Sequence, residues 1–304
     1  MIAMHANKTI HAGVLSIGYS ETGPADGSPV FLMHGFPYDI QTYAEVAPIL
    51  AEAGCRVIVP YMRGYGSTRF LDDNTPRSGE QAAFGADLLA LMDALNIQQA
   101  TLAGYDWGGR AACVVAALWP ERCTGLVSLH SYNIQNIAES LIPASPEKEQ
   151  RLWYQFYLHS ERGRAGLEQN RQAFIRHLWK EWSPTWDFDD ATFAQSAASF
   201  DNPDFVEVVI HSYKHRYGLI EGDPVYAMIE QRLAAQPVIS VPSITFDGTD
   251  DGVRGPSSPA AHGHRFSGPR SHRVVPGVGH NMPQEVPSIF AQAVLELVPA
   301  KNLS

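Results

Sequence analysis

A short segment in the first half of the chain places a carboxylate in a tight turn between an expected strand and an expected helix. Residues 101–110 are Thr-Leu-Ala-Gly-Tyr-Asp-Trp-Gly-Gly-Arg, so Asp106 stands in a Gly-x-Asp-x-Gly pattern after an apolar run. The glycines at 104 and 108 let strand and helix approach closely, and such a turn presents its central side chain above the sheet edge. An isolated Asp after a strand is usually a helix cap. Its interpretation as a nucleophile therefore depends on partners elsewhere in the chain.

Two later segments supply such partners. The run Gly277-Val-Gly-His280 places a histidine in a loop, and the apolar run that begins at Pro242 ends in Asp250 and Asp251. A histidine can activate water, while a carboxylate behind it holds the ring and supports its charge. We take Asp251 as that acid, although Asp250 adjoins it and Asp247 lies nearby. The segment Leu129-His130-Ser131, at another expected strand end, offers no carboxylate in its place.

The aspartate decides which substrates suit the site. A carboxylate that attacks an ester carbonyl gives an anhydride, which is a poor intermediate. A carboxylate that attacks a saturated carbon gives an alkyl ester, and water activated by His280 can then attack the ester carbonyl and release an alcohol. The sequence therefore predicts substrates with an electrophilic sp³ carbon.

The elements that must position these residues alternate between short apolar runs and longer helix-period segments. This pattern predicts an α/β fold with parallel strands and crossover helices. Their apolar character is continuous, as in strands covered on both faces. The expected strands are Val30–His34, Arg56–Pro60, Thr101–Gly104, Gly125–Leu129, Ser243–Phe246 and His272–Val275, with an antiparallel edge pair near Thr9–His11 and Leu15–Ser20.

Helix signals lie between these strands. Ser78 and Gln81 have capping-box spacing before an apolar helical face, and a second helix is expected from about Gly108 until Pro120. From about 132 to 236 the strand pattern vanishes and aromatic residues crowd in, and Asn202 before Pro203 marks a helix start there. We predict a core domain, 1–131 and 237–304, interrupted by a helical cap, 132–236.

Taken together, these motifs resemble the α/β-hydrolase superfamily, with Asp106 where esterases carry serine. His34-Gly35-Phe36-Pro37, Arg63-Gly64-Tyr65-Gly66-Ser67 and Gly277–His280 followed by Glu285 match further motifs of that superfamily in its own order. The resemblance implies a mostly parallel eight-stranded sheet flanked by helices and an oxyanion hole formed by the backbone N–H groups of Phe36 and Trp107. It also implies substrate contacts from His34, Pro37, Trp153 and Arg110.

Within the superfamily, the aspartate and His-Gly-Phe-Pro fit epoxide hydrolases best. Those enzymes use a pair of cap tyrosines to protonate the epoxide oxygen, and Tyr154 and Tyr213 match the two positions. The sequence around Tyr213 departs from the usual pattern, so Tyr157 and Tyr217 remain substitutes, and both candidates could instead be core aromatics.

Two alternatives stay open. A haloalkane dehalogenase needs two N–H donors for the halide; Trp107 suits one, whereas Phe36 has no side-chain N–H and Trp153 would have to serve. A fluoroacetate-type dehalogenase usually has arginine directly after the nucleophile, where Trp107 stands, although Arg110 matches its second arginine. The other alternative is a hydrolase-fold protein that binds a ligand without turnover, whose mark is a broken triad.

Composition limits the partners. The 304 residues carry a formal net charge of −10, which disfavours binding to a phosphate backbone. No apolar run approaches the roughly 20 residues of a membrane span, and the N-terminus lacks the order of a signal peptide. Cys55, Cys113 and Cys123 are expected to be reduced core residues. We expect a cytoplasmic detoxification enzyme that needs no cofactor or metal, whose partners are a small-molecule epoxide and water, with a homodimer as an open possibility.

Overall fold

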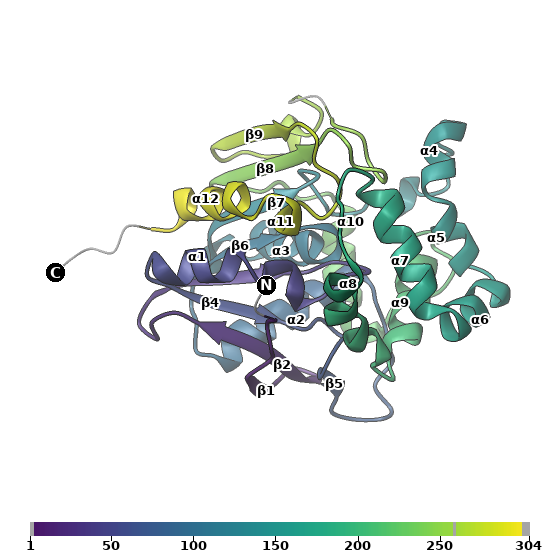
Figure 1. The fold of residues 1–304 in the computed structure, drawn as a ribbon, viewed down its shortest axis with the longest axis horizontal. Coiled ribbons are helices and arrows are strands. Elements are labelled where there is room, and N and C mark those ends of the chain that lie inside the picture. Colours follow the sequence, from purple (N-terminus) through teal and green to yellow (C-terminus); the bar gives the residue numbers. More distant parts are fainter. Residues whose placement is uncertain (1–2, 258–259, 300–304) are drawn as a thin grey trace.

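The computed structural model describes residues 3–257 and 260–299, and their centre is a twisted, mostly parallel sheet (Figure 1). Eight strands follow the order β1-β2-β4-β3-β6-β7-β8-β9, and the short strand β5 pairs with β2 beside this path. Strands β1 and β2 are antiparallel to their neighbours, whereas β3, β4, β6, β7, β8 and β9 are parallel. The bounds are β1 Lys8–Ala12, β2 Leu15–Thr22, β3 Ser28–Met33, β4 Cys55–Pro60, β5 Arg69–Phe70, β6 Ala100–Gly104, β7 Cys123–Leu129, β8 Ser243–Gly248 and β9 Arg270–Val275.

Helices cover both faces of this sheet, as its apolar strands require. On one face α1 (Val46–Glu52) packs against α12 (Pro287–Leu297), next to α11 (Met282–Glu285). On the other face α2 (Gln81–Ala94) packs against α3 (Asp106–Leu118), which lies on β6 and β7. The six expected parallel strands and the expected antiparallel edge pair are confirmed.

The remaining helices fill the stretch between β7 and β8. They are α4 (Pro146–Arg151), α5 (Trp153–Leu158), α6 (Glu161–Gln169), α7 (Arg171–Trp182), α8 (Asp190–Ala197), α9 (Phe205–His215) and α10 (Ala227–Ala234). Helices α4 to α9 lie beside the sheet on the right of Figure 1, whereas α10 packs against α2. The domain limits at 132 and 236 remain a proposal, and the outermost residues of the predicted core, 1–2 and 300–304, lie outside the described part.

Of the two expected helix starts, one is wrong and the other is displaced. Helix α2 is preceded by Glu80, and the Ser78 hydroxyl accepts a hydrogen bond from Arg63 in place of capping the helix. At this position a tertiary hydrogen bond replaces the local capping bond. Helix α9 begins at Phe205, and the Asn202 side-chain oxygen still accepts the Asp204 N–H over 2.8 Å, while its amide group donates to the backbone of Gly66 and Thr68.

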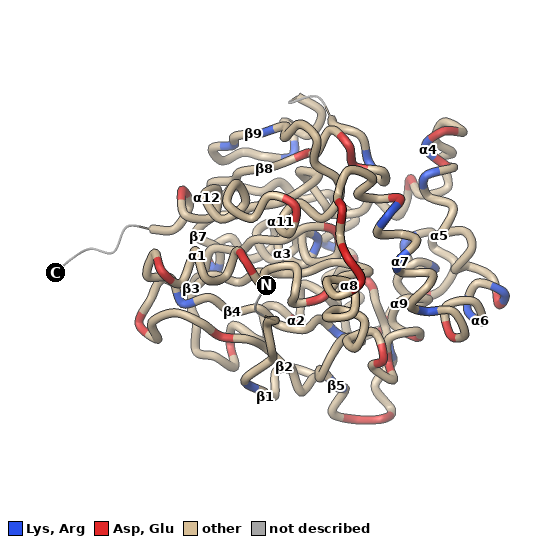
Figure 2. Tube along the Cα trace, viewed as in Figure 1, with Lys and Arg blue, Asp and Glu red and all other residues tan. Residues whose placement is uncertain are grey.

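The rest of the described chain fits a compact protein with a mixed surface. Cys55, Cys113 and Cys123 are buried and free, as expected. Acidic and basic residues are spread over both the sheet and the inserted helices (Figure 2). Within residues 3–257 and 260–299, no helix combines the length and the apolar character that crossing a membrane requires.

Candidate active site

The chemistry-bearing loops converge because parallel strands end at the same edge of the sheet. The loops after β3, β6, β7, β8 and β9 carry, in that order, Phe36, Asp106, His130, Asp251 and His280. In open α/β sheets this edge is the general location of ligand sites. The topology alone therefore brings residues from positions 36 to 280 into one cluster.

Asp106 stands at the start of α3 in a sharply turned conformation. Its φ is 48°, in the left-handed region that residues other than glycine seldom adopt. The turn needs Gly104 and Gly108, because a Cβ atom at Gly108 would lie 2.0 Å from the carbonyl oxygen of Met33, and one at Gly104 would lie 2.6 Å from Gly108. The Asp106 side chain is 14% exposed, whereas those of His280 and Asp251 are 2% and 0% exposed. Of these three side chains, that of Asp106 is the most exposed.

The loop after β3 holds the Asp106 carboxylate. The Phe36 N–H donates to Asp106 Oδ1 over 2.8 Å, and a Cβ atom at Gly35 would lie 2.5 Å from the Asp106 Cβ. One of the two expected backbone donors thus already contacts the carboxylate. The Trp107 ring is stacked between Phe36 and Phe84, at centroid distances of 5.4 and 4.9 Å. The Trp107 backbone N–H remains a proposed second donor.

Asp251 accepts four hydrogen bonds. Its Oδ1 receives the backbone N–H groups of Val253 at 2.7 Å and Arg254 at 2.9 Å. Its Oδ2 receives His280 Nδ1 at 2.8 Å and His130 Nε2 at 2.6 Å. An ionised carboxylate can only accept, so the hydrogen-bond network assigns the His280 proton to Nδ1 and leaves Nε2 as a base.

The other two acidic candidates have different partners. Asp250 accepts the hydroxyl of its neighbour Thr249, and Asp247 accepts the backbone N–H and hydroxyl of Ser257. Of the three acids considered from the sequence, Asp251 is the one that the structure places against His280.

The pKa shifts of Asp251 and His280 follow from the burial of both groups and from the hydrogen bonds that Asp251 accepts. Burial opposes ionisation of Asp251, but the two histidines, by charge and hydrogen bond, outweigh it and hold its pKa well below its usual range. Burial also lowers the pKa of His280, and the Asp251 charge and hydrogen bond more than reverse this, so the net pKa of His280 is raised. His280 Nε2 lies 3.9 Å from Asp106 Oδ2, which is too long for a direct hydrogen bond.

The His280 loop is fixed by an inserted helix and by Glu285. The carbonyl oxygen of Trp182, the last residue of α7, accepts the N–H groups of Gly252 and His280. Glu285 accepts from the Ser183 hydroxyl and from the Gly279 N–H. The end of α7 therefore sits directly on the two loops that carry Asp251 and His280.

Tyr154 and Tyr213 come together beside the nucleophile turn. Their rings lie 5.5 Å apart in an edge contact, and Tyr213 also packs 5.2 Å from Phe36 and 5.9 Å from Trp107. The Tyr154 hydroxyl accepts from Gln155 Nε2 over 2.9 Å, which leaves its proton free to be donated. Burial raises the pKa of both phenols, so both stay protonated at neutral pH. Both rings are also buried, so a core-packing role alone is compatible with their position.

The two substitutes are placed differently. The Tyr217 hydroxyl donates to Gln155 Oε1 and so reaches Tyr154 only through that side chain. The Tyr157 ring packs against Trp153 and Phe174. Neither shares the ring contacts with Phe36 and Trp107 that Tyr213 makes.

Two residues expected to contact substrate are placed otherwise, and these expectations are corrected. Trp153 donates its indole N–H to Glu181 at an exposed position, so that N–H is unavailable to a substrate or halide. His34 is buried with both ring nitrogens engaged, Nε2 with the Met62 N–H and Nδ1 with the Gly35 carbonyl oxygen. Burial lowers the pKa of His34 to about 4, so the neutral ring supports the loop that carries Phe36.

Pro37 and Arg110, the two remaining residues expected to contact substrate, differ in whether their polar atoms already have hydrogen-bond partners. The Pro37 carbonyl oxygen accepts from the indole N–H of Trp179 on α7, which joins the oxyanion loop to the inserted helices. Arg110 is buried, its Nε donates to the Asn133 carbonyl oxygen, and its Nη1 has no partner among the described residues. Burial, and then the charge of Arg216, lower the pKa of Arg110 to about 9.

Three contributors were missed by sequence reasoning. His130 contacts the acid, Trp182 packs its ring 5.0 Å from His280 and 4.9 Å from Tyr154, and Arg216 stacks 4.5 Å from the Tyr213 ring centroid. Among the described residues the Trp182 Nε1 and the Arg216 Nε and Nη2 atoms are buried without a partner. Only His130 gave a signal, because it follows an expected strand at the catalytic edge.

A metal ion is usually held by a group of His, Cys, Asp or Glu side chains. Among the described residues, one such group is found, His130, Asp251 and His280, with ligand atoms within 4.8 Å of one another. In the structure these atoms hydrogen-bond to each other through Asp251 Oδ2. That arrangement suits the support of an imidazole base.

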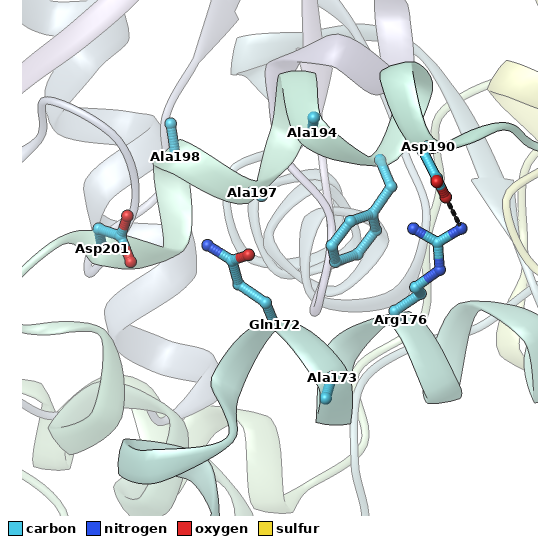
Figure 3. A pocket seen from close by; sticks show the side chains of 9 residues that line it. Gln172, Ala173, Arg176, Asp190, Ala194, Ala197, Ala198 and Asp201 are labelled. Carbon is cyan, nitrogen blue, oxygen red and sulfur yellow. Dashed lines mark hydrogen bonds and ion pairs between the residues drawn. The ribbon is translucent and has the colours of Figure 1, made fainter.

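An open pocket of about 490 Å³ lies elsewhere, between α7 and α8 (Figure 3). Arg176 and Asp190 form an ion pair at its edge, and the predicted site residues are not among those that line it. The pocket is therefore separate from the Asp106 cluster.

The fold and this cluster define a member of the α/β-hydrolase fold family. The sequence profile of that family matches residues 28–283, and the chain belongs to it. Within the family it resembles epoxide hydrolases. A solved structure from Klebsiella pneumoniae, of a protein proposed to be an epoxide hydrolase, is 52% identical with a TM-score of 0.94, covering 95% of this chain and 96% of that one.

Curated relatives match over shorter stretches. Epoxide hydrolase B of Mycobacterium tuberculosis is 32% identical over 151 residues, covering 45% of this chain and 41% of that protein. A haloalkane dehalogenase of Psychrobacter cryohalolentis is 32% identical over 111 residues, covering 36% of this chain and 35% of that protein. The matches thus span about two fifths or less of the length of these relatives.

Proposed function

We propose that this protein is an epoxide hydrolase that adds water to an epoxide through an alkyl ester on Asp106. The observation that carries the proposal is an aspartate, in place of a serine, in the nucleophile turn, held by the Phe36 N–H and facing His280. A carboxylate oxygen of Asp106 attacks an epoxide carbon, the carbon–oxygen bond of the ring breaks, and the released oxygen takes a proton from a tyrosine. The similarity to proteins named epoxide hydrolases supports this choice of substrate.

The second step returns the free enzyme. His280 Nε2 takes a proton from a water molecule whose oxygen attacks the Asp106 carboxyl carbon. Negative charge then develops on the oxygen held by the Phe36 N–H, with the Trp107 N–H as the proposed second donor. The acyl carbon–oxygen bond breaks, and the diol leaves with the proton carried by His280. Asp106 keeps one oxygen from water, and the second proton of that water passes from the Asp106 carboxyl group to the tyrosinate, which restores the phenol.

Tyr154 and Tyr213 are the proposed acid pair. An epoxide oxygen leaves as an alkoxide and needs a proton, and hydrogen bonds from two phenols stabilise charge that develops mainly in the transition state. The pairing is supported by the edge contact of the two rings and by a Tyr213 hydroxyl with no partner among the described residues. The inserted helices that hold both tyrosines are the proposed cap, residues 132–236, over a site that serves cytoplasmic detoxification.

Dehalogenation is the second candidate, and one observation favours it. Two indole N–H groups, those of Trp107 and Trp182, are buried in the cluster without a partner among the described residues. Both rings lie near Phe36, at 5.4 and 6.1 Å, and a halide ion needs such a pair of donors. A ligand-binding protein without turnover is disfavoured because Asp106, Asp251 and His280 are all brought together.

A substrate panel separates the candidates. Terminal and aryl epoxides, bromoalkanes and fluoroacetate are offered to the purified protein, with diol, alcohol and halide as the measured products. Diol from epoxides at a kcat/KM at least tenfold above that for bromoalkanes supports the proposal. Halide release without diol formation overturns it in favour of a dehalogenase, and no turnover of any substrate favours a ligand-binding protein.

A further inference from the structure

A second buried histidine shares the acid of the site. His130 follows β7 directly, its Nε2 lies 2.6 Å from Asp251 Oδ2, and its ring is stacked on that of His280 at 5.0 Å and 20°. Oδ2 of Asp251 also accepts from His280 Nδ1 over 2.8 Å. Two imidazoles therefore donate to one carboxylate oxygen, and each competes with the other for its charge.

The backbone of the turn after β7 has an unusual conformation at the residue that contacts Asp251. His130 and Ser131 have φ values of 60° and 63°, so two consecutive residues with side chains occupy the left-handed region. Such conformations cost free energy and persist where the surroundings impose them, often at functional sites. The His130 N–H donates to the Phe246 carbonyl oxygen over 2.7 Å, which fixes the turn to β8. Without this turn the imidazole would not reach Asp251.

We propose that His130 is a positioning residue that, through Asp251, limits the basicity of His280 and so sets the pH range of ester hydrolysis. The idea rests on the proposed function for its catalytic consequence, although its effect on His280 exists without substrate. A donor on a carboxylate spreads its charge and weakens its hold on a second donor. Removal of the His130 donor therefore strengthens the Asp251–His280 pair and favours charged His280. The pKa of His280 then rises further.

Other charged and aromatic groups lie near the His280 ring, and their effect on the His280 pKa must stay the same in any comparison of variants. Asp106 from α3 and Arg254 from the loop after β8 act on His280 by charge, as does Glu285 from α11. Tyr38 and Tyr105 lie against the ring, at centroid distances of 6.3 and 6.0 Å. Among the described residues, no hydrogen bond, ion pair or ring contact joins any of these five residues to His130, so we expect a shift at His280 to report on Asp251.

The test compares three variants by NMR titration of the His280 imidazole in the folded protein. His130→Leu removes the donor at similar volume, whereas His130→Gln keeps an N–H within reach of Asp251. His272→Leu is the matched control, since His272 is also buried and faces a different acid, Asp247, over 3.5 Å. We expect the His280 pKa to rise by about one unit in His130→Leu, and to stay near the wild-type value in the other two.

A kinetic readout separates this inference from the proposed function. In single turnovers with an epoxide, the hydrolysis step of His130→Leu should lose about tenfold in rate below the His280 pKa, while alkylation of Asp106 is unchanged. An unchanged His280 pKa in His130→Leu overturns the inference, and so does an equal shift in His130→Gln or His272→Leu. A shifted pKa in a protein that turns over no epoxide leaves the positioning role intact and counts against the proposed function alone.

Discussion

The two sides of Asp106 differ in how completely their polar groups are satisfied. On the side of His280, both oxygens of Asp251 accept two hydrogen bonds each, Ser183 accepts the His280 N–H, and Glu285 accepts the N–H of the neighbouring Gly279. On the side of Tyr154 and Tyr213, where α3 of the core meets the inserted helices, buried donors lack partners among the described residues. They are Trp107 Nε1 and Arg110 Nη1 on α3, and Trp182 Nε1, Tyr213 Oη and the Arg216 Nε and Nη2 atoms in the inserted stretch.

The difference separates two tasks. A buried donor without a partner costs free energy, so natural proteins rarely keep several together unless a ligand uses them. The satisfied side orients a base before any substrate arrives, and it leaves His280 Nε2 without a partner among the described residues. The unsatisfied side offers donors to the group that leaves carbon. We therefore assign water activation to the loops that carry Asp251 and His280, and leaving-group stabilisation to the groups that lie where α3 meets the inserted helices.

The largest effect is expected from the satisfied side. His280→Gln removes the base while keeping a polar side chain, so alkylation of Asp106 should persist and hydrolysis of the ester should fall by about 10²–10⁴-fold. The ester should then accumulate and be visible by mass spectrometry of the intact protein after mixing with epoxide. His272→Gln serves as the control for loss of a buried histidine. Wild-type turnover in His280→Gln, or no alkylation at all, would contradict the division of tasks.

The opposite pattern is expected on the unsatisfied side. Tyr154→Phe and Tyr213→Phe each remove one phenol and keep the ring, so alkylation by epoxides should slow strongly, and in the double variant by about 10²–10⁴-fold. Bromoalkanes, whose leaving group needs no proton, should be unaffected. Tyr157→Phe, outside the cluster, is the matched control, and thermal melting should hardly change. If both single variants open epoxides at the wild-type rate, the tyrosines do not act as the acid.

The pH dependence should divide the two steps in the same way. The neutral form of His280 is the base, and its pKa is raised above 6.5 because Asp251 stabilises the charged ring against the opposing effect of burial. Ester hydrolysis should therefore increase with pH and level off above that raised pKa, falling about tenfold per unit below it. Alkylation should not share this acid limb. Single-turnover rates between about pH 5 and 9 test this. A hydrolysis rate that reaches half of its maximum below pH 6.5, or a decrease at low pH that both steps share, would contradict it.

The smallest effect is expected from the unpaired guanidinium of Arg216. It stacks on Tyr213 and forms no ion pair with a described carboxylate, so it is available to a negatively charged substituent of the substrate. Arg216→Met should raise KM for an epoxide carboxylate by about tenfold and leave that for its methyl ester nearly unchanged. Arg164→Met, which loses an exposed pair with Glu207, is the control. Equal effects on acid and ester would mean that Arg216 acts by packing alone.

The satisfied side was largely predictable from the sequence, and the reason is topological. Each of the three residues Asp106, Asp251 and His280 follows a strand. Parallel strands bring such residues to one edge of the sheet, whatever the conformation of the loops. Asp251 was preferred to Asp250 from the sequence, and the coordinates place Asp251 against His280, whereas Asp250 accepts from Thr249. His130 was noted only as the absence of a carboxylate, since nothing in the sequence shows that a left-handed turn aims its ring at Asp251.

The unsatisfied side was predicted less well. Helical periodicity places Tyr213 on a buried face but says nothing of how the inserted helices sit on the core. That is why Trp153 was expected in the site and Trp182 was not, although both lie on neighbouring helices. The orientation depends on long-range hydrogen bonds, such as those from Trp179 to Pro37 and from Ser196 to Asp39. Such contacts have no signature in a local pattern.

Isotope labelling in a single turnover can detect the proposed covalent ester on Asp106. Excess enzyme is mixed with an epoxide in H₂¹⁸O for one turnover, and both the diol and the peptide that contains Asp106 are analysed by mass spectrometry. We predict ¹⁸O in the Asp106 peptide and none in the diol, because the attacking water joins the carboxyl carbon and the diol keeps an oxygen from the enzyme. Label in the diol with none in the Asp106 peptide would show direct attack of water on the epoxide and would exclude the ester.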